Sequence, residues 1–171
     1  MKGKWAQGMP PRHFEWVIGD RLAVCERIGG YGPSHRRVRR AEEIVWVKDQ
    51  GFTCVVSIMA SPHNLHAYEE AGLSARHLPL MGNDDQAATL QELLVELRHS
   101  LVAGERLLVH DDDVGDRVQG VLAGYLVHAG LVPEPTRAVA MLERLLHRPM
   151  GPPGRELVAL AQRLVTPSTG G

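Results

Sequence analysis

Hydrophobic residues recur along this chain with two different periods. Between residues 86 and 101 one stripe of leucines follows helical spacing: Leu90, Leu93, Leu94, Leu97 and Leu101. The same period covers 38–48 and 118–129, which predicts two more amphipathic helices. The segments 135–147 and 152–165 also read as helices, the second of them opened by a proline pair.

Short apolar runs lie between these helical segments. The runs at 15–18 and 21–25, joined by Gly19 and Asp20, predict a hairpin. The runs at 52–59, 75–80 and 106–110 predict three further strands, of which the first has the unbroken β-branched pattern of a strand covered on both faces. Strands that alternate with helices predict an α/β fold with a central, mainly parallel sheet flanked by helices.

Length and composition indicate the number of domains and the cellular compartment. The 171 residues, 44% hydrophobic and 23% charged, predict a single domain over 1–171 with frayed termini. No apolar run is long enough to cross a membrane, and no apolar segment follows the two N-terminal lysines, so we expect no membrane association and a cytoplasmic protein. Cys25 and Cys54 lie in strand-like runs, where buried thiols are expected.

Charge is distributed unevenly although the net charge is only −1. One basic cluster consists of Arg36, Arg37, Arg39 and Arg40. It is either the solvated start of a helix or a site for a protein partner or a phosphorylated ligand. Because the whole chain has no basic excess, nucleic-acid binding is not expected.

The opposite charge gathers in the sequence "RLLVHDDDVGDRV" at 106–118, a strand followed by a loop and a predicted helix. Ligands of α/β proteins bind beyond the carboxyl ends of strands, where loops lead into helices. Backbone N–H groups and the positive end of the helix dipole converge there, which suits an anion. The loop nevertheless carries four aspartates: Asp111, Asp112, Asp113 and Asp116.

The frame of this loop resembles that of the cysteine-dependent tyrosine and dual-specificity phosphatases, His-Cys-five residues-Arg. His110 and Arg117 stand at its ends, and Asp111 stands at the cysteine. The segment 77–94 is similar to the family's general-acid loop and following helix, with Asp84 at the acid, and 120–152 is similar to its two later helices. The resemblance implies a dual-specificity-phosphatase-like core over about 14–165. It implies a phosphate loop made of His110, Asp112, Asp113, Val114, Gly115, Asp116 and Arg117.

Three departures from the family bear on catalysis. Asp111 replaces the nucleophile, Val114 replaces a glycine of the loop, and Val118 replaces the hydroxyl residue after the arginine. A carboxylate about 4 Å from a phosphate charge costs on the order of 4 kcal/mol per unit charge at an effective dielectric constant near 20. The sequence therefore predicts a catalytically inactive pseudophosphatase that binds a protein or a phosphorylated ligand.

Several interpretations of the aspartates stay open. Asp116 can cap the following helix, while Asp111 can accept the loop amides and pair with Arg117 as an internal phosphate mimic. The loop can instead hold a divalent cation through Asp111 and Asp113, although no cofactor is expected. The main alternative function is a phosphoester hydrolase without a cysteine, with Asp111 as nucleophile and Asp113 as acid/base beside magnesium, as in haloacid-dehalogenase-type phosphatases.

Two weaker candidates complete the set. Asp84 and Asp85 supply either a general acid or a helix cap. His63 and His66 have a spacing that can serve a metal on a helix, but such a pair is more often a surface feature. The sequence does not indicate the oligomeric state.

Overall fold

A computed structural model describes residues 8–30, 33, 35–62, 65–80 and 86–165. Its centre is a five-stranded sheet in the order β1-β2-β5-β3-β4. The strands are β1 (Glu15–Ile18), β2 (Leu22–Glu26), β3 (Cys54–Ser57), β4 (Ser74–His77) and β5 (Leu107–Asp111). Only β1 runs antiparallel to its neighbour, so the sheet is mainly parallel, as the alternation of strands and helices predicts.

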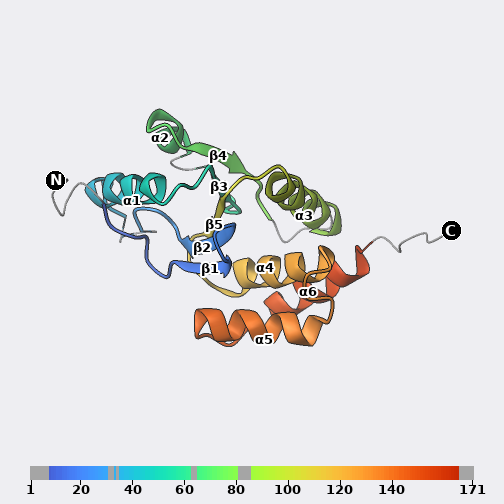
Figure 1. Cartoon of the computed structure of the whole chain (residues 1–171). Coiled ribbons are helices and arrows are strands. Elements are labelled where there is room, and N and C mark those ends of the chain that lie inside the picture. The colour runs from blue at the N-terminus through green and yellow to red at the C-terminus, as the bar shows by residue number, and fades with distance from the viewer. Residues whose placement is uncertain (1–7, 31–32, 34, 63–64, 81–85, 166–171) are drawn as a thin grey trace.

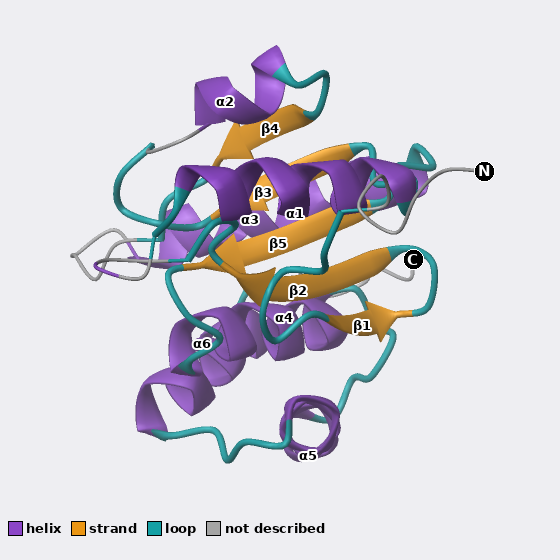
Figure 2. Ribbon diagram, turned by 90° about the vertical axis from the view of Figure 1, so that its left-hand side faces the viewer, coloured by secondary structure: helices purple, strands orange, loops and turns teal. Residues whose placement is uncertain are grey.

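Helices cover both faces of this sheet (Figure 1). They are α1 (Arg37–Asp49), α2 (Leu65–Glu70), α3 (Gln86–Val102), α4 (Asp116–His128), α5 (Pro135–Leu146) and α6 (Pro152–Arg163). One core cluster joins the sheet to α1 and α2, and a larger one joins its other face to α3, α4, α5 and α6. Figure 2 shows α1 across one face of the strands and α4 and α6 beyond the other.

The predicted elements are confirmed apart from one short helix. The proline pair does open α6, the leucine stripe of α3 is buried, and Cys25 and Cys54 are buried free thiols. The six-residue helix α2 was not predicted, because it buries only Tyr68 and so leaves no apolar stripe in the sequence.

Helix α4 is the central element behind β5. Ten of its thirteen residues are buried, and it packs most closely on α6. A β-carbon added at Gly120 would lie 2.7 Å from the Gly154 carbonyl oxygen, so this close helix contact requires glycine. The packing fixes α4, and with it the position of Arg117 in its first turn.

Among the described segments, no helix combines the length and the apolar character needed to span a membrane.

Candidate functional site

The candidate site is the turn between β5 and α4. β5 lies between β2 and β3 at the centre of the sheet, and it ends at Asp111, opposite Glu26 of β2. Residues 112–115 form the loop, and α4 begins at Asp116. The sequence-predicted strand, loop and helix are thus in their expected order, with the loop at the carboxyl ends of the parallel strands.

Asp111 and Arg117 form a bidentate ion pair across this loop. Nε of Arg117 donates to Oδ2 of Asp111 at 2.6 Å, and Nη2 donates to Oδ1 at 2.6 Å. The backbone N–H of Asp112 also donates to Oδ1, at 2.8 Å. Asp111 is only 4% exposed. Its carboxylate therefore points into the loop, where it accepts hydrogen bonds from the Arg117 guanidinium and from one backbone amide of the loop.

The electrostatics of Arg117 follow from this pair. Its hydrogen bonds with Asp111 raise the pKa of the guanidinium, while partial burial works in the opposite direction. Its third nitrogen, Nη1, donates to the Leu80 carbonyl at 3.4 Å. Arg117 is thus a fixed cation whose principal partner is a side chain of the same loop.

His110 is buried directly before Asp111. Its Nδ1 lies 3.2 Å from the Asp111 carbonyl oxygen, where a protonated Nδ1 can donate, and its ring meets Tyr68 edge-on. Burial lowers the pKa of His110 to about 4, against smaller opposing effects from the Asp111 carbonyl and carboxylate. His110 is therefore neutral at neutral pH and cannot supply a positive charge to an anion in the loop.

The middle of the loop faces outward. Asp112 pairs with Arg27 at 3.7 Å, and its side chain is half exposed. Asp113 is partly exposed. The buried Val114 turns its carbonyl oxygen toward Arg148, whose Nη1 donates to it at 2.8 Å. The aspartates thus have different surroundings, and only Asp111 turns into the loop beside Arg117.

The helix-capping role expected of Asp116 is wrong. Gly115 occupies the N-cap position of α4 and no side chain caps it, because Asp116 already lies in the first helical turn. Its carboxylate instead accepts the backbone N–H of Gly151 at 2.9 Å, just before α6. Asp116 therefore ties α4 to α6.

The basic cluster does not present four free guanidinium groups. Nε of Arg39 donates to the buried carboxylate of Glu43 at 2.9 Å, and burial raises the pKa of that carboxyl group. Arg36 donates to the Pro33 and His35 carbonyls. Arg37 is exposed, and Arg40 is partly buried. A ligand site at this helix start stays a prediction, and its most accessible members are Arg36 and Arg37.

The remaining candidates from the sequence are two acidic residues and two histidines. Asp84, Asp85 and His63 lie outside the described residues, while His66 is exposed on α2. Within the described ranges, no group of three histidine, cysteine, aspartate or glutamate residues has metal-binding geometry. A cation site at Asp111 and Asp113 stays a hypothesis, and it would have to displace the Arg117 guanidinium.

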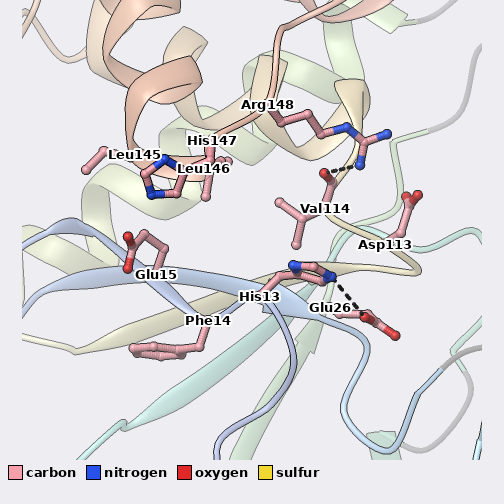
Figure 3. Close-up of a pocket in the computed structure, with 10 residues that line it drawn as sticks. All are labelled: His13, Phe14, Glu15, Glu26, Asp113, Val114, Leu145, Leu146, His147 and Arg148. Atoms are coloured by element: carbon pink, nitrogen blue, oxygen red, sulfur yellow. Dashed lines mark hydrogen bonds and ion pairs between the residues drawn. The ribbon is translucent and has the colours of Figure 1, made fainter.

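A cavity of about 480 Å³ lies beside the loop (Figure 3). It is bounded by the start of β1, the end of β2, the loop and the C-terminal end of α5. Its lining consists of His13, Phe14, Glu15, Glu26, Asp113, Val114, Leu145, Leu146, His147 and Arg148. Most of these residues were not singled out from the sequence. Glu26 ends β2, which runs parallel to β5, and its position at the carboxyl end of a strand was the available signal.

Comparisons with solved structures give the fold class. Kinase-associated phosphatase, solved with its catalytic-site cysteine substituted by serine, is 19% identical over 88% of this chain and 93% of its own, with a TM-score of 0.74. Tk-PTP in its active form is 16% identical over 90% of this chain and 98% of its own, with a TM-score of 0.70. The core catalytic domain of the PP-IP phosphatase SIW14 from S. cerevisiae, in complex with citrate, is 12% identical over 89% and 86%, with a TM-score of 0.65.

The chain therefore has the fold of the dual-specificity and protein tyrosine phosphatases, and the fold expected from the resemblance is confirmed. No protein-family model and no curated protein matches the sequence.

Proposed function

We propose that this protein is a pseudophosphatase: a phosphatase-fold protein that lacks cysteine-type catalysis and binds a protein or a phosphorylated ligand. Asp111 stands where the fold's enzymes carry their nucleophilic cysteine, and its carboxylate takes the place of a bound phosphoryl group. The observation that carries the proposal is the bidentate pair between the buried Asp111 carboxylate and Arg117.

The contacts of Asp111 support the role of internal phosphate mimic. A planar carboxylate matches the two parallel donors of a guanidinium, as a phosphoryl group does. The Asp112 amide donates to the same carboxylate, as a cradle amide would donate to phosphate. A phosphoryl group entering the loop would meet this buried negative charge, so a phosphorylated ligand is expected to bind outside the loop.

The same contacts disfavour catalysis by Asp111. A carboxylate nucleophile needs a free oxygen aimed at the phosphorus atom, and both Asp111 oxygens accept from Arg117 at 2.6 Å. The side chains of Val114 and Val118 are aliphatic, so neither side chain supplies a polar group to a reacting phosphate. We therefore place the hydrolase without a cysteine second.

Turnover of p-nitrophenyl phosphate tests this proposal. Purified protein, with and without Mg²⁺, should release p-nitrophenol no faster than buffer. Asp111→Cys should restore at most slow turnover, because Val114 and Val118 still stand at the other altered positions of the loop. Wild-type turnover that Asp111→Ala abolishes would overturn the proposal in favour of the hydrolase.

A further inference from the structure

The cavity beside the loop is separate from the Asp111–Arg117 pair. Neither of these two residues lines it, although Asp113 and Val114 of the same loop do. Figure 3 shows its walls, with the C-terminal end of α5 on one side and the beginning of β1 and the end of β2 on the other. A volume of about 480 Å³ lies within the usual range for small-ligand sites.

Carboxylates dominate the charge of this cavity. Glu15, Glu26 and Asp113 line it, and Arg148 is the one arginine or lysine among the described residues of its lining. Nη1 of the Arg148 guanidinium is held by the Val114 carbonyl. With three carboxylates against one guanidinium group, the lining carries a net negative charge.

Glu26 is the most informative of these carboxylates. The residue is 5% exposed, which is unusual for glutamate, because a buried carboxylate normally has a cationic partner. Within the described part of the chain, the basic group that pairs with it is Nε2 of His13, at 3.9 Å, on a side chain that is 70% exposed. This contact is longer than a hydrogen bond and carries charge only when His13 is protonated. The Glu26 carboxylate can therefore still accept hydrogen bonds from a bound cation.

The C-terminal end of α5 makes the electrostatic potential in the cavity more negative. Leu145 and Leu146 belong to the last turn of this twelve-residue helix, and His147 caps it in the left-handed conformation, with φ 53°. All three line the cavity. The negative end of the helix dipole favours cations near such a terminus.

Apolar groups line the remaining space. Phe14 lies on the strand side, and Leu145 and Leu146 lie on the helix side. Walls of this kind suit a methylene chain, as the stems of arginine and lysine show when they pack on apolar surfaces while their charged ends find polar partners.

We propose that this cavity binds a guanidinium or ammonium group carried on an aliphatic stem, with Glu26 as its principal acceptor. Such a group is found on the arginine and lysine side chains of proteins and on free aliphatic amines. The site goes beyond the proposed function, since it requires neither Asp111 nor an inactive loop. Failure to bind a cation would leave the pseudophosphatase proposal intact, and phosphatase turnover would leave this one intact.

Calorimetric titration of the full-length protein tests the site. N-acetyl-arginine amide should bind at least about tenfold more tightly than N-acetyl-citrulline amide, its neutral isostere, because a charged donor strengthens a hydrogen bond to a carboxylate. Glu26→Gln should weaken the arginine probe by about the same factor. Glu156→Gln, which removes an exposed carboxylate of α6 outside the cavity, should not change its affinity.

The outcomes are distinct. Equal affinity for the two probes, or equal weakening by Glu26→Gln and Glu156→Gln, would overturn the proposal. If Glu26→Gln does not fold, Glu15→Gln takes its place, because Glu15 is a partly buried carboxylate of the same lining. Its effect on the affinity for the arginine probe is then compared with that of Glu156→Gln. Tighter binding of acetyl-Ala-Arg-Ala-amide than of agmatine would support the site and assign it to a protein side chain, whereas the reverse order would support it and assign it to a free amine.

Discussion

Asp111→Asn should lower the free energy of unfolding by about 2 kcal/mol. The change keeps the shape of the side chain but removes the charge that Arg117 contacts through two hydrogen bonds. Loss of one partner of a fully buried pair typically costs about 3–5 kcal/mol, and the 40% exposure of the Arg117 side chain reduces that cost here through solvent screening. Urea unfolding at pH 7 measures the change.

Asp112→Asn is the matched control. Its carboxylate neighbours Asp111 in the chain but is 49% exposed and 3.7 Å from Arg27, so its loss should cost at most about 1 kcal/mol. Arg117→Gln combined with Asp111→Asn should cost less than the sum of the two single changes, because both remove the same interaction. Unchanged or increased stability of Asp111→Asn would mean that this pair does not hold the loop.

Stability should also fall as the pH decreases from about 6.5 to about 4. In the folded protein burial lowers the pKa of His110 to about 4, whereas the unfolded chain regains the ordinary value near 6.5. Between these values the unfolded state binds the proton and the folded state does not, so acid favours unfolding. The total loss from this one group is on the order of 3 kcal/mol.

The difference between wild type and His110→Asn isolates this effect from the titration of carboxylates. The variant should lose less stability than wild type between pH 6.5 and 4, while His66→Asn, at an exposed position of α2, should follow wild type. Denaturant unfolding at several pH values gives the comparison. Parallel pH profiles for wild type and His110→Asn would show that His110 is not buried in its neutral form.

Local sequence patterns predicted much of this fold. Strand and helix periods differ clearly in 54–57 and 86–102, and β-branched runs and leucine stripes have few other interpretations. The short helix α2 was missed because six residues with one buried side chain carry no period. The capping role predicted for Asp116 was wrong because local patterns do not show distant partners. Its hydrogen-bond partner, Gly151, lies thirty-five positions away.

Prediction of the candidate site was also restricted to features that lie within one short segment of the sequence. The frame from His110 to Arg117 was readable because a single turn contains it. The cavity was not, because it combines Glu26, Asp113 and Arg148 from three distant segments. The four arginines at 36–40 looked equivalent in the sequence, yet packing separates Arg39, which pairs with Glu43, from Arg37 at the surface.

Titration with inorganic phosphate tests the central claim most directly, that the Asp111 carboxylate occupies the anion cradle. Wild type should bind phosphate at least about tenfold more weakly than Asp111→Ser, since one unit of buried like charge at about 4 Å costs several kcal/mol. The backbone amides of 112–117, followed by NMR, should shift with phosphate only in the variant. Wild-type binding as tight as that of Asp111→Ser, with shifts in the same amides, would contradict the account.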